Sequence, residues 1–464
     1  MARILSSMYY LEGLPAMILS HVKKSLGLPK FDKRVLFGHW IEDNMNLKLT
    51  TAMMTMMFLC SALAGCTGGD DDGIELDGSD GGYEYASNVD NHRMLMGDVC
   101  DIKDLSGAYD WDGVKNIYED GEHAEKSDGS YRTLMGFADA SGKNHAYDAY
   151  YGADGSWNDF VSAAIDGTGA FAGESDTVRD QATEKGIQNG VMTAYAIHEL
   201  NAAIGKAEAG NWGPDDAQHA WDEGWAFYHG PDDADADYDG CGPYATADKR
   251  AGNFGTANAD GTAATNVATL EAMNAGLTAM QNEDMQGLVD ARDEILKNIV
   301  IVYSQASVRY ASKMTGDLAD GDTADYDKHQ AEGHAFYRVI EAYVAEYTSI
   351  CYNMVSHTVS SDSSQASCEA YMYLENYTSS NDPNGEEFTG CYNSVTHAQH
   401  EGMSQEECEA FGWYANYYSD KIVAMFDLSN DGDASADYEA DIRTWLQPAW
   451  DHYGITADDI GTLQ

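Results

Sequence analysis

Apolar residues recur every three to four positions along most of the chain, and loops rich in Gly or Asp separate these stretches. This spacing puts the apolar side chains on one face of an α-helix, so each stretch predicts an amphipathic helix. Runs of alternating β-branched residues, which would indicate strands, are absent. The pattern therefore predicts an all-α protein. The predicted helices cover residues 111–118, 156–165, 177–207, 217–228, 263–281, 285–314, 325–347 and 437–453.

A six-residue pattern occurs twice. Residues 223–228 are Glu-Gly-Trp-Ala-Phe-Tyr, and residues 332–337 are Glu-Gly-His-Ala-Phe-Tyr. Each copy follows a long predicted helix and a loop, at 210–216 in the first copy and at 315–323 in the second. Self-similarity of this size indicates a duplicated helical hairpin. We expect a bundle of two halves related by a pseudo-twofold axis, in which the helices that carry the pattern, the motif helices, face each other.

Cysteines form a shorter repeat, in which two pairs have the same spacing. In an exported protein such regular cysteines favour disulfides over a thiolate metal site, because the exterior is oxidising. We predict bonds within each pair, each stapling a small helical hairpin in an insertion at residues 349–419, with bonds across the repeats as the alternative. The cysteines concerned are Cys351 with Cys368, Cys391 with Cys408, and Cys100 with Cys241 as a possible third bridge.

The first part of the chain predicts export. Residues 45–65 contain a lysine, an apolar stretch and a final Leu-Ala-Gly, which is the order of a secretory signal peptide. Cys66 follows directly, as in a lipobox, so we expect it to be lipidated and to anchor the protein to the outer face of the cytoplasmic membrane, at the cell surface or in the periplasm. Residues 1–44 are interpreted as a mis-called upstream start, with an authentic extension as the alternative. Residues 66–88 have too little apolar content to pack and predict a flexible acidic tether, which leaves 89–464 as the helical domain.

The charge balance is strongly acidic. The 464 residues include 78 Asp or Glu and 26 Lys or Arg, which gives a formal net charge of −52. Such a chain repels nucleic acid and anionic membranes. A salt-adapted surface explains this acidity, so the charge alone does not argue for a metal site. Nucleotide and serine-hydrolase chemistry are not indicated, because the sequence has neither a Gly-rich phosphate loop after a strand nor a Gly-x-Ser-x-Gly elbow.

The repeated pattern carries residues that bind metals. His219 precedes Glu223 by four positions and His329 precedes Glu332 by three, so each imidazole shares a helix face with its carboxylate. Facing motif helices would bring these groups to one shared centre. Carboxylate and phenolate oxygens with some imidazole suit Fe(III), a hard cation. The candidate ligands are Glu223, Glu332, His219, His329, Asp222, His334, Tyr228 and Tyr337, with His198, Glu199 and Glu341 as weaker candidates.

A structural interpretation competes with the metal site. The aromatic residues at 225, 227, 336 and 337 are more typical of a packed core than of a binding site. Glutamates between such bulky apolar residues are costly to bury unpaired, which favours a functional role for Glu223 and Glu332. An ion pair with Lys249 or Arg250 is the main alternative to a metal for these carboxylates.

Several stretches occur together in an order that resembles a known family. They are 117–121 (Ile-Tyr-Glu-Asp-Gly), 127–134 (Ser-Asp-Gly-Ser-Tyr-Arg-Thr-Leu), 150–152 (Tyr-Tyr-Gly), 219–228 (His-Ala-Trp-Asp-Glu-Gly-Trp-Ala-Phe-Tyr), 247–250 (Ala-Asp-Lys-Arg), 331–333 (Ala-Glu-Gly) and 453–461 (Tyr-Gly-Ile-Thr-Ala-Asp-Asp-Ile-Gly). The chain thus resembles the low-iron-inducible periplasmic proteins of algae, associated with iron assimilation. More distantly, it is similar to imelysin-like iron-regulated proteins, with His329 and Glu332 as their His-x-x-Glu element. The lipobox and the cysteine repeats depart from the family pattern.

The resemblance implies an extracytoplasmic protein that captures iron or helps to import it, without catalytic turnover. Together with the residue chemistry, it gives the hypothesis of a lipid-anchored protein that binds iron, as Fe(III), and passes it to a membrane importer. Another divalent or trivalent metal is an alternative cargo. The alternative functions are a di-metal carboxylate enzyme that oxidises Fe(II), and a cell-surface adhesion or scaffold protein.

Overall fold

A computed structural model describes residues 76, 78–141, 143, 145–232, 238, 241–378 and 387–464. The chain divides into two units, Met1–Thr67 and Gly68–Gln464, and all described residues belong to the second. The predicted extension (1–44), signal peptide (45–65) and lipidation site (Cys66) lie outside the described residues.

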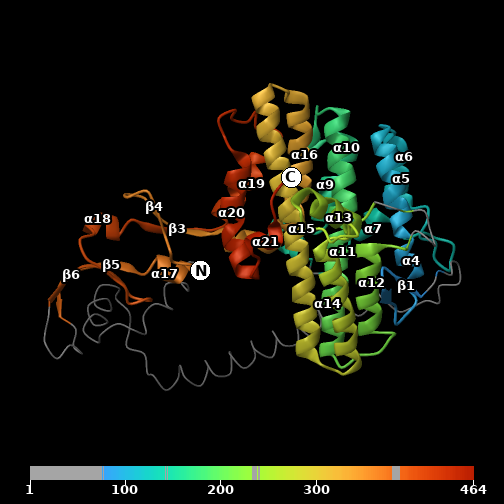
Figure 1. The fold of residues 1–464 in the computed structure, drawn as a ribbon, viewed down its shortest axis with the longest axis horizontal. Coiled ribbons are helices and arrows are strands. Elements are labelled where there is room, and N and C mark those ends of the chain that lie inside the picture. Colours follow the sequence, from blue (N-terminus) through green and yellow to red (C-terminus); the bar gives the residue numbers. More distant parts are fainter. Residues whose placement is uncertain are drawn as a thin grey trace, which may run out of the picture. The chain divides into compact units, whose positions relative to one another are not determined.

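The described chain is mostly helical, as predicted, and the helix boundaries follow the hydrophobic pattern closely (Figure 1). None of the helices in this part of the chain is long and apolar enough to span a membrane. The helices before the first motif helix are α4 (Asp90–Arg93), α5 (Leu95–Gly107), α6 (Trp111–Asp120), α7 (Leu134–Ala138), α8 (Ala146–Tyr151), α9 (Ser156–Asp166), η1 (Gly169–Phe171), α10 (Asp176–Lys185), the π-helix η2 (Gly186–Val191) and α11 (Met192–Glu208). The later ones are α12 (Ala217–His229), α13 (Pro243–Phe254), α14 (Ala264–Gln281), α15 (Met285–Asp320), α16 (Thr323–Val344), η3 (Ala345–Thr348), α19 (Tyr417–Met425), α20 (Tyr438–Tyr453) and α21 (Ala457–Ile460).

Both predicted hairpins are present, as α11 with α12 and as α15 with α16. The second loop is shorter than predicted, because α15 continues to Asp320 and α16 begins at Thr323. A twofold relation between the hairpins stays a prediction.

The motif helices α12 and α16 have different neighbours. α12 packs against α11, α4, α14 and α13, whereas α16 packs against α15, α10 and α19. Helices α10 and α11 are the first and last parts of one long helical run that η2 joins. The two motif helices therefore lie near opposite ends of this run, as Figure 1 also shows. This corrects the expectation that they face each other: each long helix extends beyond the part that its own hairpin partner covers.

The residues just before α4 are ordered, although the predicted tether extends to residue 88. Strands β1 (Ser79–Asp80) and β2 (Tyr83–Glu84) form an antiparallel hairpin. The Tyr83 side chain is fully buried, and its hydroxyl donates to Asp222 Oδ1 on α12 at 2.6 Å. This segment is held by polar contacts with the helices rather than by apolar content, which is why its composition was misleading.

The cysteine repeats form small sheets, which corrects the predicted helical hairpins. One sheet has the order β4 (Thr358–Ser360), β3 (Ile350–Asn353), β8 (Phe411–Tyr414), and the other has β5 (Tyr371–Thr378), β6 (Glu387–Asn393), β7 (Gln399–His400). Only one-turn helices, α17 (Gln365–Cys368) and α18 (Gln405–Cys408), lie between them. The disulfides match the predicted pairing within each repeat and the third bridge. They are Cys351–Cys368, Cys391–Cys408 and Cys100–Cys241.

The glycine of the second motif helix lies against an aromatic ring. A Cβ atom added at Gly333 would lie 2.0 Å from a ring carbon of Phe426, which is buried. We therefore expect Gly333→Ala to lower the free energy of unfolding by about 1–3 kcal/mol, because the ring has to move. Urea denaturation followed by circular dichroism measures this change.

Gly316 in α15 is the matched control. It is exposed, and a Cβ atom there would meet nothing within 4 Å. Gly316→Ala should stabilise the protein by about 0.5–1 kcal/mol, because alanine costs less backbone entropy in a helix. Equal effects of the two substitutions would contradict this packing argument.

Candidate metal site

Two buried glutamates lie where the helices of the first hairpin approach closely. Glu199 is on α11 and Glu223 is on α12, and they are 4% and 2% exposed. Gly224 allows this approach, since a Cβ atom there would lie 2.9 Å from Leu200 Cδ2 and 3.3 Å from the Ala196 carbonyl oxygen. The sequence-predicted role of this glycine is thus confirmed, and its effect is to bring Glu223 against α11. The two carboxyl groups are hydrogen-bonded to each other.

Two imidazoles converge on Glu223. His219 lies one turn earlier on α12, and its Nε2 is 3.1 Å from Glu223 Oε1. His92 comes from α4, and its Nε2 is 3.2 Å from the same oxygen. Of the rings, that of His92 is nearly fully buried and that of His219 largely so. We call His92, Glu199, His219 and Glu223 the His/Glu cluster.

Asp222 and Ser87 orient the ring of His219. Asp222 accepts hydrogen bonds from Tyr83 Oη, from the backbone of Ala86 and Ser87, and from Ser87 Oγ at 2.8 Å. Because this hydroxyl proton points to Asp222, the Ser87 oxygen accepts from Nδ1–H of His219, 2.9 Å away. Nε2 is then the nitrogen that faces Glu223. Such support of the far ring nitrogen is typical of metal-binding histidines.

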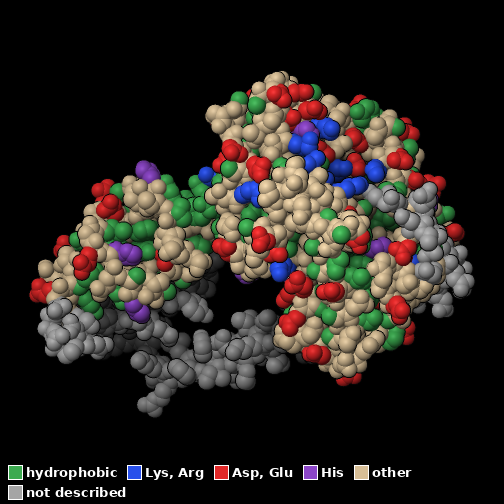
Figure 2. All heavy atoms as spheres, viewed as in Figure 1, with side chains coloured by type: hydrophobic (Ala, Val, Ile, Leu, Met, Phe, Trp, Pro, Cys, Tyr) green, Lys and Arg blue, Asp and Glu red, His purple; other side chains and the backbone are tan. Residues whose placement is uncertain are grey.

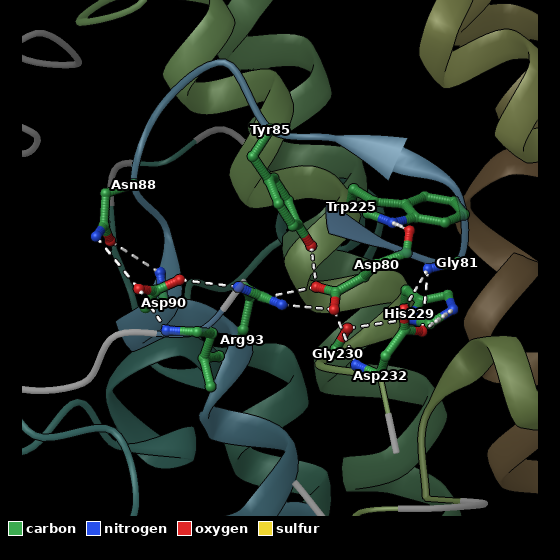
Figure 3. A network of polar contacts seen from close by, with 11 residues as sticks. Asp80, Gly81, Tyr85, Asn88, Asp90, Arg93, Trp225, His229, Gly230 and Asp232 are labelled. Carbon is green, nitrogen blue, oxygen red and sulfur yellow. Dashed lines mark hydrogen bonds and ion pairs between the residues drawn. The ribbon is translucent and has the colours of Figure 1, made fainter. Parts of the chain in front are cut away.

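A buried ion-pair network fixes His92 in place (Figure 3). Arg93, its neighbour on α4, donates to Asp80 with Nε and Nη2, both at 2.5 Å, and to Asp90 with Nη1 at 2.9 Å. The carbonyl of Asp80 accepts from the indole of Trp225 on α12 at 3.1 Å. The network thus joins α4 and the β1–β2 hairpin to the motif helix. Each charge in it is paired, which is the condition for burying an arginine at low cost.

The four side chains shift one another's pKa values. Burial would raise the pKa of Glu223, but His92 and His219 outweigh it and hold that pKa well below its usual range. Burial and the charge of Glu223 raise the pKa of Glu199 well above its usual range. Burial lowers the pKa of His92 to about 3. Burial would also lower the pKa of His219, but the hydrogen bond and charge of Glu223 overcome it and raise that pKa. Near neutral pH, Glu223 is therefore the ionised carboxylate and Glu199 holds a proton.

His198 lies at the edge of this cluster. Its Nε2 is 3.8 Å from Glu199 Oε1, and its ring is 4.6 Å from that of His145, centroid to centroid. Burial, with smaller effects from His145 and a lysine, lowers the pKa of His198 to about 3. The imidazole therefore stays neutral and available as a donor next to Glu199.

The second copy of the pattern forms a separate cluster, which corrects the expectation of one shared centre. Glu332 interacts with the phenol of Tyr310, which also interacts with Arg250. His329 Nδ1 is 2.6 Å from Asp317 Oδ2. The groups that act on Glu223 are those of the His/Glu cluster, and Glu332 is not among them. For Glu332, the structure agrees with the alternative in which a basic residue is close by.

The remaining predicted ligands have other surroundings. Tyr228 donates to Asn266 at 2.7 Å and Tyr337 to Ser419 at 2.8 Å, and both are buried with the aromatic residues of the pattern. His334 packs its ring against Phe160, and burial lowers its pKa to about 4. Asp222 uses its oxygens to hold residues 83–87. These positions belong to the core and its supports, as the structural interpretation predicted for the aromatic residues.

The cluster's donors are hydrogen-bonded to one another in this arrangement. Among the described residues, no group of three or more His, Cys, Asp or Glu side chains is spaced so that it could hold a metal ion as it stands. The two nitrogen–oxygen distances at Glu223, 3.1 and 3.2 Å, are nevertheless close to the separation of about 3.0–3.4 Å between neighbouring donors around an ion with bonds near 2.1 Å. Loading would require loss of the protons that hold these contacts and a local spreading of the donors.

Sequence reasoning missed His92 and Ser87. Both lie outside the repeat, on or beside a segment whose composition predicts a tether. The nearby Asn91-His92-Arg93 has no spacing that indicates metal binding. Only the fold, through the contact of α4 with α12, brings these residues to the motif helix.

Comparisons with known proteins point to one family. A family model described as low iron-inducible periplasmic protein matches residues 54–341. This match covers more than half of the chain, includes the whole His/Glu cluster and ends before the cysteine repeats. No curated protein and no solved structure matches the chain.

The pKa of His219 should depend on Glu223. In Glu223→Gln, burial acts on His219 without the opposing charge, so the pKa should fall below 6.5. The raised pKa contributes stability that is present below pH 6.5 and is lost as the pH rises through the folded-state value, so the variant should lose this part of its pH dependence. A histidine-selective NMR titration in the presence of a chelator measures the pKa. Glu332→Gln is the control and should leave it unchanged; an unshifted His219 in Glu223→Gln would contradict the assignment.

Proposed function

Because the chain belongs to the family of low iron-inducible periplasmic proteins, we propose that it binds iron outside the cytoplasm through the His/Glu cluster and serves iron capture or uptake. The observation that carries this proposal is the convergence of two imidazoles from different segments on one buried carboxylate, beside a second carboxyl group. Two histidines with one carboxylate are a common ligand set of non-haem iron.

The charge of the cluster favours Fe(II) over the Fe(III) predicted from sequence. With Glu223 ionised, Glu199 protonated, His92 neutral and His219 protonated, the cluster is neutral. Fe(II) bound by two carboxylates and two neutral imidazoles is also neutral, so one ion replaces two protons. Fe(III) would leave an extra buried positive charge, which is costly to bury unpaired. The phenols of Tyr228 and Tyr337, which would have favoured Fe(III), are hydrogen-bonded elsewhere.

Export is part of this proposal. The family's description supports a periplasmic location, and three disulfides are typical of an oxidising compartment. Lipidation at Cys66 would keep the protein at the membrane, next to an importer that accepts the iron. The cysteine repeats lie beyond the family match and are available for a contact that other family members lack.

Glu223→Gln should weaken iron binding by more than about 100-fold, because the loss of a second-shell partner alone typically costs 10–100-fold. His92→Gln, which removes a donor from another segment, should act in the same direction. Competition with a chelator, followed by elemental analysis, measures affinity and stoichiometry for Fe(II) under argon and for Fe(III). Glu332→Gln is the matched control, since it neutralises the glutamate of the other motif helix. Loss of binding in Glu332→Gln together with unchanged binding in Glu223→Gln would contradict the site assignment.

We propose binding without turnover. Fe(II) added with oxygen should then be taken up to one equivalent per cluster, and oxygen consumption should not continue beyond it. An oxygen electrode with excess Fe(II) makes the measurement, with Glu223→Gln to subtract the reaction in solution. Sustained oxygen consumption that Glu223→Gln abolishes would instead identify a ferroxidase-like enzyme.

A further inference from the structure

A group of basic side chains lies close together on this strongly acidic protein. Lys249 on α13 has Lys103 of α5, Lys185 of α10 and the adjacent Arg250 as electrostatic neighbours. We call these four residues the basic cluster. The contacts of α5 with α10, and of α13 with the start of η2 directly after Lys185, bring their helices together. Figure 2 shows Lys and Arg side chains gathered on one part of the helical surface, whereas Asp and Glu are spread over the rest.

Arg250 is the unusual member of the basic cluster. It is 8% exposed, yet its Nε and Nη1 atoms are buried without a hydrogen-bond partner. Its guanidinium lies 5.7 Å from the ring centre of Tyr310 and 5.8 Å from that of Phe336, which are stacked on each other. These rings hold the guanidinium in place but accept no conventional hydrogen bond. A buried donor pair without an acceptor is rare in native proteins and indicates a missing ligand.

The carboxylates of the chain do not neutralise this region. Glu184 pairs with Lys185 at 2.7 Å, and Glu332 lies near Arg250 through Tyr310. Four cations beside two carboxylates leave an excess of two positive charges. Among the described residues, no ion pair joins Arg250 to a carboxylate. The chain has three times as many acidic as basic residues, 78 against 26, so acidic partners were plentiful.

We propose that the basic cluster binds a multivalent oxyanion of the phosphate class, with Arg250 as its anchor. The planar guanidinium donates in parallel from two nitrogens to two oxygens of such an anion. The lysines act as point charges around it. An anion with two negative charges balances the excess of two, whereas chloride balances only half. Repulsion between the clustered cations, which together with burial lowers the pKa of Lys249, would be relieved by the bound anion.

This site is independent of the His/Glu cluster. Its residues lie on α5, α10 and α13, and none of them is a proposed iron donor. Binding is therefore tested in the presence of a chelator, so that its failure leaves the iron proposal standing and the reverse also holds.

The test is titration of the full chain with inorganic phosphate, followed by isothermal calorimetry and by phosphorus NMR line width at constant ionic strength. We expect saturable binding of one phosphate, weakened about ten- to hundredfold in Arg250→Gln, because hydrogen bonds to charged groups have this value. Lys103→Gln, at a half-buried position that is safer for folding, should weaken binding in the same direction. Circular dichroism and a thermal melt show that each variant is folded.

Lys115→Gln is the matched control. It removes one positive charge from α6, where Lys115 pairs with Asp166 at 2.8 Å outside the basic cluster. This variant should bind phosphate as the wild type does. Sulfate should compete with phosphate, and chloride at the same ionic strength should not. Absence of saturable binding, or equal weakening in Lys115→Gln and Lys103→Gln, would overturn the proposal, since the second result indicates only a general effect of net charge.

Discussion

The buried carboxylate of Glu223 is the group to which the first half of the helical body is adapted. A carboxylate that is 2% exposed is tolerable only if its charge is compensated. The compensation comes from three directions: His219 on the same helix, His92 on α4 and Glu199 on α11. Each requires its own support, from Gly224 for the approach of α11, from Ser87 and Asp222 for the ring of His219, and from the Asp80–Arg93 ion pair for α4. Removing one support would leave a charge in the interior without its partners.

Local periodicity predicted the helices well because it is a local property. The helices predicted at 217–228 and 263–281 begin and end within about one residue of α12 and α14. The disulfide pairing was also predictable, since short loops between regularly spaced cysteines close most easily. The strands of the cysteine repeats were not, because they are short and their side chains do not alternate between buried and exposed over more than a few residues. There the disulfides and pairing across the repeats determine the structure.

The candidate site was half predictable. His219, Glu223 and Glu199 could be found because helical spacing and a duplicated pattern draw attention to them. The shared centre with Glu332 was wrong, since a sequence repeat shows that two hairpins are similar but not which faces meet. In the fold, the long helical run separates them, and the second glutamate lies near Tyr310 and Arg250. The same pattern has thus acquired an imidazole-rich environment in one hairpin and a cation-rich one in the other.

The Cys100–Cys241 bond has a consequence for how the cluster opens. It joins α5, which directly follows α4 and His92, to the segment just after α12, and it closes a loop with a sequence separation of 141 residues. Glu199, His219 and Glu223 all lie inside this loop, and His92 lies close to its base. If α4 detaches, His92 therefore remains at a high effective concentration near its partners instead of diffusing away. The cluster can then behave as a tethered chelate, in which an ion leaves through brief local opening while the ligand set stays assembled for the next one.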